Sequence, residues 1–179
     1  MRAVLEAAGR PCGLIGTIEA RVGGRRVSVS HTTPESVELQ GLLAQMVAAG
    51  DRAVALEVSS HALAQRRVAG LDFAAALFTN LTRDHLDYHP DEDDYYAAKR
   101  KLFLRPEGEG ANPPGASNID DAFGRRLARA AGLMTYAIND LGADVRPTDL
   151  RPSRGGFRAV MQTPRGHFPL RSRLRGIFN

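Results

Sequence analysis

The sequence predicts an α/β fold, a mostly parallel, doubly wound sheet with flanking helices. Residues 53–58 and 73–78 are continuous apolar runs, which is the pattern of strands covered on both faces. Segments with helical periodicity alternate with these runs, as in α/β proteins. The 179 residues are 43% hydrophobic, which is enough for one domain with a buried core.

The first elements carry clear local signals. Residues 2–8 have the pattern of a helix that Gly9 ends, and residues 12–18 have that of a buried strand. Residues 21–27 are expected to form a hairpin with Gly23 and Gly24 at its turn, because glycine adopts positive φ angles at low cost.

A long helix is predicted before the strand at 53–58. Thr33 is placed as its N-cap, Pro34 in its first position and Gly50 at its end. The apolar side chains between these points recur at helical spacing: Leu39, Leu42, Leu43, Met46 and Val47.

The second half of the chain changes in texture. Residues 93–103 are predicted to be helical, and residues 104–118, rich in Pro, Gly and polar side chains, are predicted to be an internal loop. A further helix covers residues 119–131 and ends at Gly132. Short strand candidates follow at residues 133–138, 157–162 and 168–170.

Composition limits the classes of partner. The net charge is +4, but the arginines are scattered, tryptophan is absent and aromatic residues make up only 6% of the chain. This is a poor supply of stacking surfaces for single-stranded nucleic acid, and a mildly basic surface suits a small anionic ligand equally well. We therefore expect no nucleic-acid partner, a hypothesis that the salt dependence of binding would test.

The sequence also bears on location. It has no apolar stretch near the roughly 18 residues that a membrane span needs, and no signal peptide is evident. A single cysteine, Cys12, suits a reducing compartment, and its apolar surroundings favour a packed thiol over a nucleophile. A cytoplasmic protein without a membrane partner is expected.

Polar side chains follow two predicted strands. Glu57 and Ser59-Ser60-His61 come after one strand, and residues 79–89 come after the other. Because parallel strands end at the same edge of a sheet, the two clusters are expected to meet, and their oxygens suit Mg²⁺. The simpler interpretation is that Asp84 caps a turn and His85 packs. A zinc site at His85 and His89 is disfavoured, since Pro90 and the acidic run after it argue against a long helix there.

Four motifs resemble the middle domain of the Mur ligase family, in order and spacing. They are Thr32-Thr33-Pro34, Glu57-Val58-Ser59-Ser60-His61, Thr79-Asn80-Leu81 with Asp84-His85-Leu86-Asp87, and Ala97-Ala98-Lys99 with Leu102-Phe103. Together they span residues 12–103, and a weaker similarity continues to residue 179. They look most like the members that add a diamino acid to UDP-N-acetylmuramoyl-L-alanyl-D-glutamate in peptidoglycan biosynthesis.

The resemblance implies roles for individual residues. Lys99 would be carbamylated, which turns a cation that repels Mg²⁺ into an anionic oxygen ligand. Lys99 and His85 would then be catalytic, and Glu57, His85 and Lys99 would hold the metal. Asn80 would contact the nucleotide. The substrate would be bound by Thr32, Thr33, Ser59, Gln65 and Arg67, with Arg67 suited to a carboxylate or phosphate group.

The implied reaction is ATP-dependent amide formation with Mg²⁺. The glutamate carboxylate of the substrate would attack the γ-phosphate of ATP, and the amine of the diamino acid would displace phosphate from the acyl phosphate. Whether lysine or diaminopimelate is added stays open. Two alternatives also stay open: a non-catalytic module that binds UDP-muramoyl peptide, and a ligase like folylpolyglutamate synthetase.

One family feature is missing. The fold implied is that of a P-loop nucleotide hydrolase, whose phosphate-binding loop ends in Gly-Lys-Thr, and no such segment occurs in these 179 residues. We therefore expect residues 1–179 to be a single, partial middle domain that begins after this loop and is inactive by itself. Residues 112–117 also depart from the apolar strand that the family has there.

Overall fold

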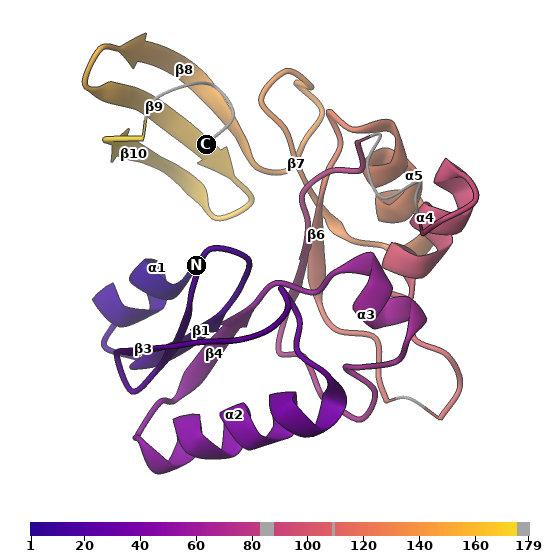
Figure 1. Ribbon diagram of the computed structural model, residues 1–179. Coiled ribbons are helices and arrows are strands. Elements are labelled where there is room, and N and C mark those ends of the chain that lie inside the picture. Colours follow the sequence, from indigo (N-terminus) through magenta and orange to yellow (C-terminus); the bar gives the residue numbers. More distant parts are fainter. Residues whose placement is uncertain (83–87, 109, 175–179) are drawn as a thin grey trace. The chain divides into compact units, whose positions relative to one another are not determined.

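The computed structural model describes residues 1–82, 88–108 and 110–174 (Figure 1). The chain divides into two compact units. Unit 1 contains residues 1–72 and 85–111, and unit 2 contains residues 73–84 and 112–179. Each unit is built from two separate stretches of sequence. That residues 1–179 form a single, partial middle domain stays a prediction.

Unit 1 is built on a four-stranded sheet of order β3-β2-β1-β4. β1 (Cys12–Ile15) pairs in parallel with β4 (Ala53–Leu56) and antiparallel with β2 (Ala20–Val22). β2 and β3 (Arg25–Val27) form the predicted hairpin, with φ angles of 54° at Gly23 and 78° at Gly24. Both glycines lie in the left-handed region, as the turn requires.

Two helices flank this sheet. α1 (Arg2–Ala7) packs against β1 and β4, and α2 (Ser36–Ala48) packs against the sheet from the opposite face (Figure 1). α2 buries Leu39, Leu42 and Met46, as its apolar periodicity predicted. A Cβ added at Gly13 of β1 would clash with the sulfur of Met46, so the helix approaches the strand closely at a glycine.

The rest of unit 1 is a pair of helices in contact, α3 (Ser60–Ala64) and α4 (Glu92–Arg100). Each has a side-chain N-cap. The hydroxyl of Ser59 accepts from the Ala62 amide, and the Asp91 carboxylate accepts from the Asp94 amide. Among the described residues, no helix is long and apolar enough to cross a membrane.

Unit 2 contains a parallel sheet of order β5-β6-β7, formed by Ala76–Phe78, Gly115–Asn118 and Met134–Tyr136. α5 (Ala122–Ala131) packs against β6 and ends at Gly132, whose φ angle is 60°. The buried side chains of Ile119, Ala128, Ala137 and Ala143 form one hydrophobic cluster in this unit.

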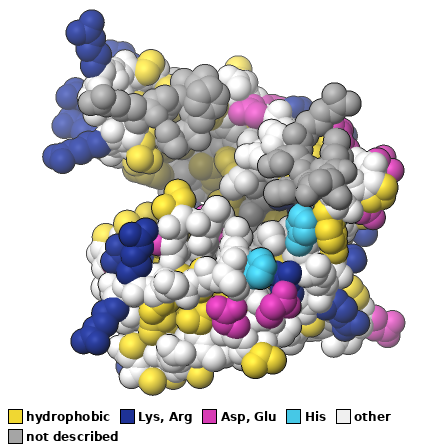
Figure 2. All heavy atoms as spheres, viewed as in Figure 1, with side chains coloured by type: hydrophobic (Ala, Val, Ile, Leu, Met, Phe, Trp, Pro, Cys, Tyr) yellow, Lys and Arg dark blue, Asp and Glu magenta, His cyan; other side chains and the backbone are white. Residues whose placement is uncertain are grey.

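A second sheet of unit 2 is antiparallel, with the order β10-β9-β8. Its strands are β8 (Arg146–Ser153), β9 (Gly156–Thr163) and β10 (Gly166–Ser172). The register places Arg158 opposite both Arg151 and Arg171, so three exposed arginines form one row across the sheet. Figure 2 shows basic side chains projecting from this part of the surface, at its upper left.

The expected α/β class, with parallel strands and flanking helices, is confirmed, but two local predictions are wrong. The internal loop expected at residues 104–118 is shorter, because residues 115–118 form β6, and pairing with strands on both sides outweighs the low strand propensity of Gly-Ala-Ser-Asn. The N-cap of α2 is Glu35 and not Thr33, because the Thr33 hydroxyl bonds to the loop after β4. A third prediction is also wrong: β4 and β5 were expected to end at one edge of a single sheet, but β4 pairs with β1 and β5 pairs with β6, so they belong to different sheets. Whether the polar clusters that follow them meet stays a prediction.

Candidate substrate and metal site

Glu57 follows β4 directly, and Thr17 holds its carboxylate. Oε2 of Glu57 accepts from the backbone amide of Thr17 at 2.8 Å and from its hydroxyl at 2.7 Å. A Cβ added at Gly16 would lie 2.8 Å from the carboxyl carbon of Glu57, so glycine leaves room for this contact. The exposed Glu57 therefore keeps one oxygen, Oε1, that accepts neither of these bonds.

Thr17 was not predicted as a site residue, although a signal for it exists. It lies two residues after β1, the parallel neighbour of β4, so its position at the same sheet edge follows from the topology. Its hydroxyl also lies 3.1 Å from that of Thr32. Because an ionised carboxylate only accepts, Thr17 donates to Glu57, and Thr32 then donates to Thr17.

Thr33 connects the loop before α2 to the loop after β4. Its hydroxyl donates to the Glu57 carbonyl at 2.8 Å and accepts from the Ser59 amide at 3.0 Å. Thr33 is 0% exposed, so its hydroxyl, which is common to both bonds, is shielded from water. In this conformation, the Thr33 side chain shapes the loop that carries Glu57 and Ser59.

Arg67 meets the same loop from the far end of α3. Its Nη1 donates to the Thr33 carbonyl at 2.9 Å, its Nη2 lies 2.8 Å from Oε1 of Glu35, and its Nε donates to Gln65 at 2.8 Å. Arg66, which directly precedes Arg67, has a φ angle of 58°. This left-handed conformation is rare for residues other than glycine. Thr33, Ser59 and Arg67 are thus brought together, with Gln65 beside them.

Lys99 lies half-buried in the last turn of α4, with its Nζ 5.1 Å from the centroid of the Tyr95 ring. A cation is attracted to the face of such a ring, whereas an anionic carbamate would lose this attraction. His85 lies outside the described residues, so the expected grouping of Glu57, His85 and Lys99 stays a prediction. The described residues contain no cluster of three or more His, Cys, Asp or Glu side chains that could hold a metal.

The donor chemistry fits Mg²⁺ in part. The exposed carboxylate of Glu57 is a suitable hard ligand, and a carbamate on Lys99 would be another. An uncharged or cationic amine at Lys99 would not be, so the fit depends on carbamylation.

Asn80 lies in unit 2, in an anchored loop. The carbonyl of Thr79 accepts from the Asn118 side chain at 2.9 Å, and the amide of Leu81 donates to Asp121 at 3.0 Å. The exposed Asn80 between them is therefore presented by a backbone that is held on both sides.

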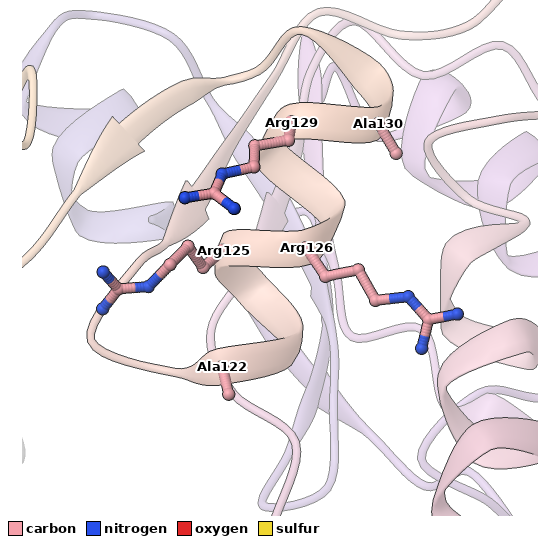
Figure 3. Close-up of a pocket in the computed structure, with 5 residues that line it drawn as sticks. All are labelled: Ala122, Arg125, Arg126, Arg129 and Ala130. Atoms are coloured by element: carbon pink, nitrogen blue, oxygen red, sulfur yellow. The ribbon is translucent and has the colours of Figure 1, made fainter.

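His89, the second histidine of the disfavoured zinc pair, is 1% exposed, and both of its ring nitrogens bond to protein. Cys12 is buried as expected, and burial raises the pKa of its thiol. A shallow pocket elsewhere, on α5, is lined by Arg125, Arg126 and Arg129 with two alanines (Figure 3). It contains none of the predicted site residues.

Comparison with known proteins places the chain in a family. Residues 1–179 match the Mur ligase middle domain. The chain is 43% identical to UDP-N-acetylmuramoyl-L-alanyl-D-glutamate–2,6-diaminopimelate ligase of Geobacter sulfurreducens and 46% identical to the ligase of the same name from Ectopseudomonas mendocina. These matches cover 100% and 98% of the chain but only 36% of each relative, so the chain spans about a third of their length.

Solved structures agree. A structure of UDP-N-acetylmuramoyl-L-alanyl-D-glutamate–2,6-diaminopimelate ligase superposes with a TM-score of 0.87 at 29% identity, over 99% of this chain and 36% of that one. A mutant of L. casei folylpolyglutamate synthetase shares the fold with a TM-score of 0.59 at 15% identity, over 99% of this chain and 50% of that one. The chain therefore belongs to the Mur ligase family and corresponds to its middle domain.

Proposed function

We propose that this chain is the middle part of an ATP-dependent ligase that adds a diamino acid to UDP-N-acetylmuramoyl-L-alanyl-D-glutamate. The main structural support is the convergence of Thr33, Ser59 and Arg67 on the loop that also carries Glu57. The names of the relatives favour 2,6-diaminopimelate as the added amino acid.

Arg67 would bind an anionic group of the substrate. Its guanidinium side chain is only 10% exposed, and Glu35, which is 60% exposed, occupies one of its nitrogens. A carboxylate or phosphate of the ligand could replace Glu35 at Nη2 without breaking the bond from Nη1 to Thr33. Thr32, Ser59 and Gln65 would add single hydrogen bonds around it.

The reaction would require ATP and Mg²⁺. The Mg²⁺ ion would neutralise charge on the phosphoryl group that ATP transfers. Glu57, held by Thr17, would be one metal ligand, together with His85 and the carbamate of Lys99. Asn80 would contact the nucleotide. To form the carbamate, the neutral amine of Lys99 would attack carbon dioxide and release a proton.

The test is calorimetric titration of the protein with UDP-N-acetylmuramoyl-L-alanyl-D-glutamate. Arg67→Ala is expected to weaken binding about ten- to a hundredfold, the usual range for a hydrogen bond to a charged group. Arg10→Ala removes the same charge at an exposed position after α1 and is the matched control. Equal affinities for the wild type and Arg67→Ala would contradict the substrate assignment.

The other functions separate in simple ways. A non-catalytic muramoyl-peptide module would bind the same ligand, but no diamino acid would be incorporated even when a phosphate loop is supplied by the rest of a ligase. A folylpolyglutamate synthetase-like enzyme would prefer a folate, and solved structures of that enzyme at 15% identity support only the shared fold. A nucleic-acid protein would show binding that falls steeply with salt.

A further inference from the structure

His89 is a buried side chain that connects the two contacting helices of unit 1. Its Nε2 lies 3.0 Å from the hydroxyl of Ser60, the first residue of α3, and its Nδ1 lies 2.7 Å from Oδ2 of Asp94, in the first turn of α4. His89 is 1% exposed and Ser60 is 2% exposed. Both ring nitrogens are therefore used by the protein itself.

The chemistry of the partners fixes the direction of the bonds. The side chain of Asp94 is 52% exposed, and an ionised carboxylate only accepts hydrogen bonds. Nδ1 of His89 must therefore carry a proton. In the neutral ring Nε2 is then an acceptor, and the hydroxyl of Ser60 donates to it.

The chain Ser60–His89–Asp94 has the order of groups found in serine hydrolases, but it cannot act as one. Ser60 is buried at the start of a helix, so its hydroxyl does not reach a substrate. The arrangement must serve the structure around it.

That structure contains the expected substrate and metal residues. At the α3 end, Ser59 precedes Ser60, caps the helix and donates its amide to Thr33. At the α4 end, the His89 ring stacks on Tyr95, with centroids 5.1 Å apart and an angle of 19° between the rings. The same Tyr95 ring lies 5.1 Å from Nζ of Lys99.

We infer that His89, protonated at Nδ1, is a positioning residue that fixes the Ser59–Ser60 end of α3 against the helix that carries Lys99. The ring makes one hydrogen bond to Ser60 of α3 and one to Asp94 of α4. Loss of one bond therefore removes the contact of the ring with one helix and leaves its bond to the other. The functional part of this inference rests on the proposed function, since it assumes that Ser59 contacts the muramoyl substrate.

Paired substitutions separate the two bonds. His89→Asn keeps a donor near the position of Nδ1 and so retains the bond to Asp94, whereas His89→Gln places an amide near Nε2 and retains the bond to Ser60. Ser60→Ala should then add no destabilisation to His89→Asn but should further destabilise His89→Gln, and Asp94→Asn should give the reverse pattern. Glu107→Gln, which removes a carboxylate at an exposed position outside α4, is the control.

Three measurements on the whole chain decide the outcome. The ¹⁵N shifts of His89 should show a protonated Nδ1, and an unprotonated Nδ1 would overturn the assignment. Exchange of the Ala62 amide, which Ser59 caps, should be about tenfold faster in His89→Asn, the change expected for loss of one hydrogen bond. Equal effects of Ser60→Ala in both His89 backgrounds would show that the ring acts by packing alone and would overturn the positioning role.

Ligand affinity separates this inference from the proposed function. If the wild type binds UDP-N-acetylmuramoyl-L-alanyl-D-glutamate, His89→Asn should weaken that binding severalfold, and unchanged affinity would refute the link to the substrate. If the wild type does not bind it, the proposed function fails. The ¹⁵N shifts, the amide exchange and the paired substitutions then still decide whether His89 positions α3.

Discussion

At the scale of single residues, Thr33 combines burial with two hydrogen bonds that no other group replaces. Its hydroxyl serves the Glu57 carbonyl and the Ser59 amide while the residue is 0% exposed. Valine has nearly the same shape but no hydroxyl, so Thr33→Val would leave the part-buried Glu57 carbonyl and Ser59 amide without this partner. We expect a loss of about 1–3 kcal/mol in the free energy of unfolding, measured by urea denaturation.

Thr32→Val is the control for this change. Thr32 is half-buried, and its hydroxyl contacts only the Thr17 hydroxyl at 3.1 Å among the described contacts, so its loss should cost less than about 1 kcal/mol. Equal losses for the two variants would mean that the bonds of Thr33 are not what stabilises the loop.

Asp144 gives a prediction about acid. Its Oδ2 accepts from the backbone amide of Thr135 at 2.8 Å and from the Thr135 hydroxyl at 2.7 Å, and these bonds hold the pKa of Asp144 below its usual value of 3.8. Because the folded pKa is the lower one, the stabilisation is complete above the pKa of the unfolded chain. It is lost as the pH falls through the folded pKa.

Between about pH 5 and pH 2, Asp144→Asn should therefore lose less stability than the wild type. The midpoint of thermal unfolding at several pH values measures this difference. Glu107→Gln makes the same change of charge at an exposed position and should follow the wild-type curve. A curve for Asp144→Asn that parallels the wild type would contradict the role of these two bonds.

At the scale of elements, short sequence patterns correctly predicted the helices and turns that depend on nearby residues. The hairpin at residues 21–27 follows from two adjacent glycines, and the interior of α2 follows from its apolar spacing. β6 and β8 were missed because their sequences, Gly-Ala-Ser-Asn and Arg-Pro-Thr-Asp-Leu-Arg-Pro-Ser, have little strand character. Both are strands because neighbouring strands supply hydrogen-bond partners, which a single-sequence pattern does not reveal.

The arginine row of the antiparallel sheet is a testable property of an element. Arg151, Arg158 and Arg171 lie directly opposite one another, and like charges in such positions repel. Asp149 pairs with Arg151 at 2.9 Å, but both side chains are largely exposed, so the compensation is small.

Replacing the central Arg158 by threonine should raise the free energy of unfolding by about 0.2–1 kcal/mol at low salt. The gain should shrink as salt screens the repulsion, which denaturation at two ionic strengths would show. Arg154→Thr, at the exposed turn between β8 and β9, is the control outside the row. A destabilised Arg158→Thr would mean that the aliphatic stem of this arginine, and not its charge, dominates.

At the scale of the whole molecule, the chain enters each compact unit twice, so neither unit is a continuous segment. The residues proposed for the candidate site came from motifs in register, and their roles stay predictions. In the structure, Thr33, Ser59 and Arg67 lie together through contacts across 26 and 34 residues of sequence. The contacts of Thr17 with Glu57 and of His89 with Ser60 were not predicted, because the partners are distant in sequence. Tertiary packing decides such pairs.

The last prediction concerns ATP. A polypeptide of these 179 residues is expected not to turn over ATP, because phosphoryl transfer depends on positioning and charge neutralisation and the sequence contains no Gly-Lys-Thr loop. Loss of one electrostatic group commonly costs about a hundred- to a thousandfold in rate, and the loop supplies several backbone amides and a lysine.

The assay is phosphate release with Mg²⁺, UDP-N-acetylmuramoyl-L-alanyl-D-glutamate and diaminopimelate or lysine present. Activity should appear when the same residues are placed within a complete ligase, and there Lys99→Ala should abolish it, because the carbamate proposed as a Mg²⁺ ligand could not form. Lys101→Ala, two residues further along the same chain and exposed, should keep it. Turnover near about 1 per second by the 179 residues alone would show that another group binds the phosphates.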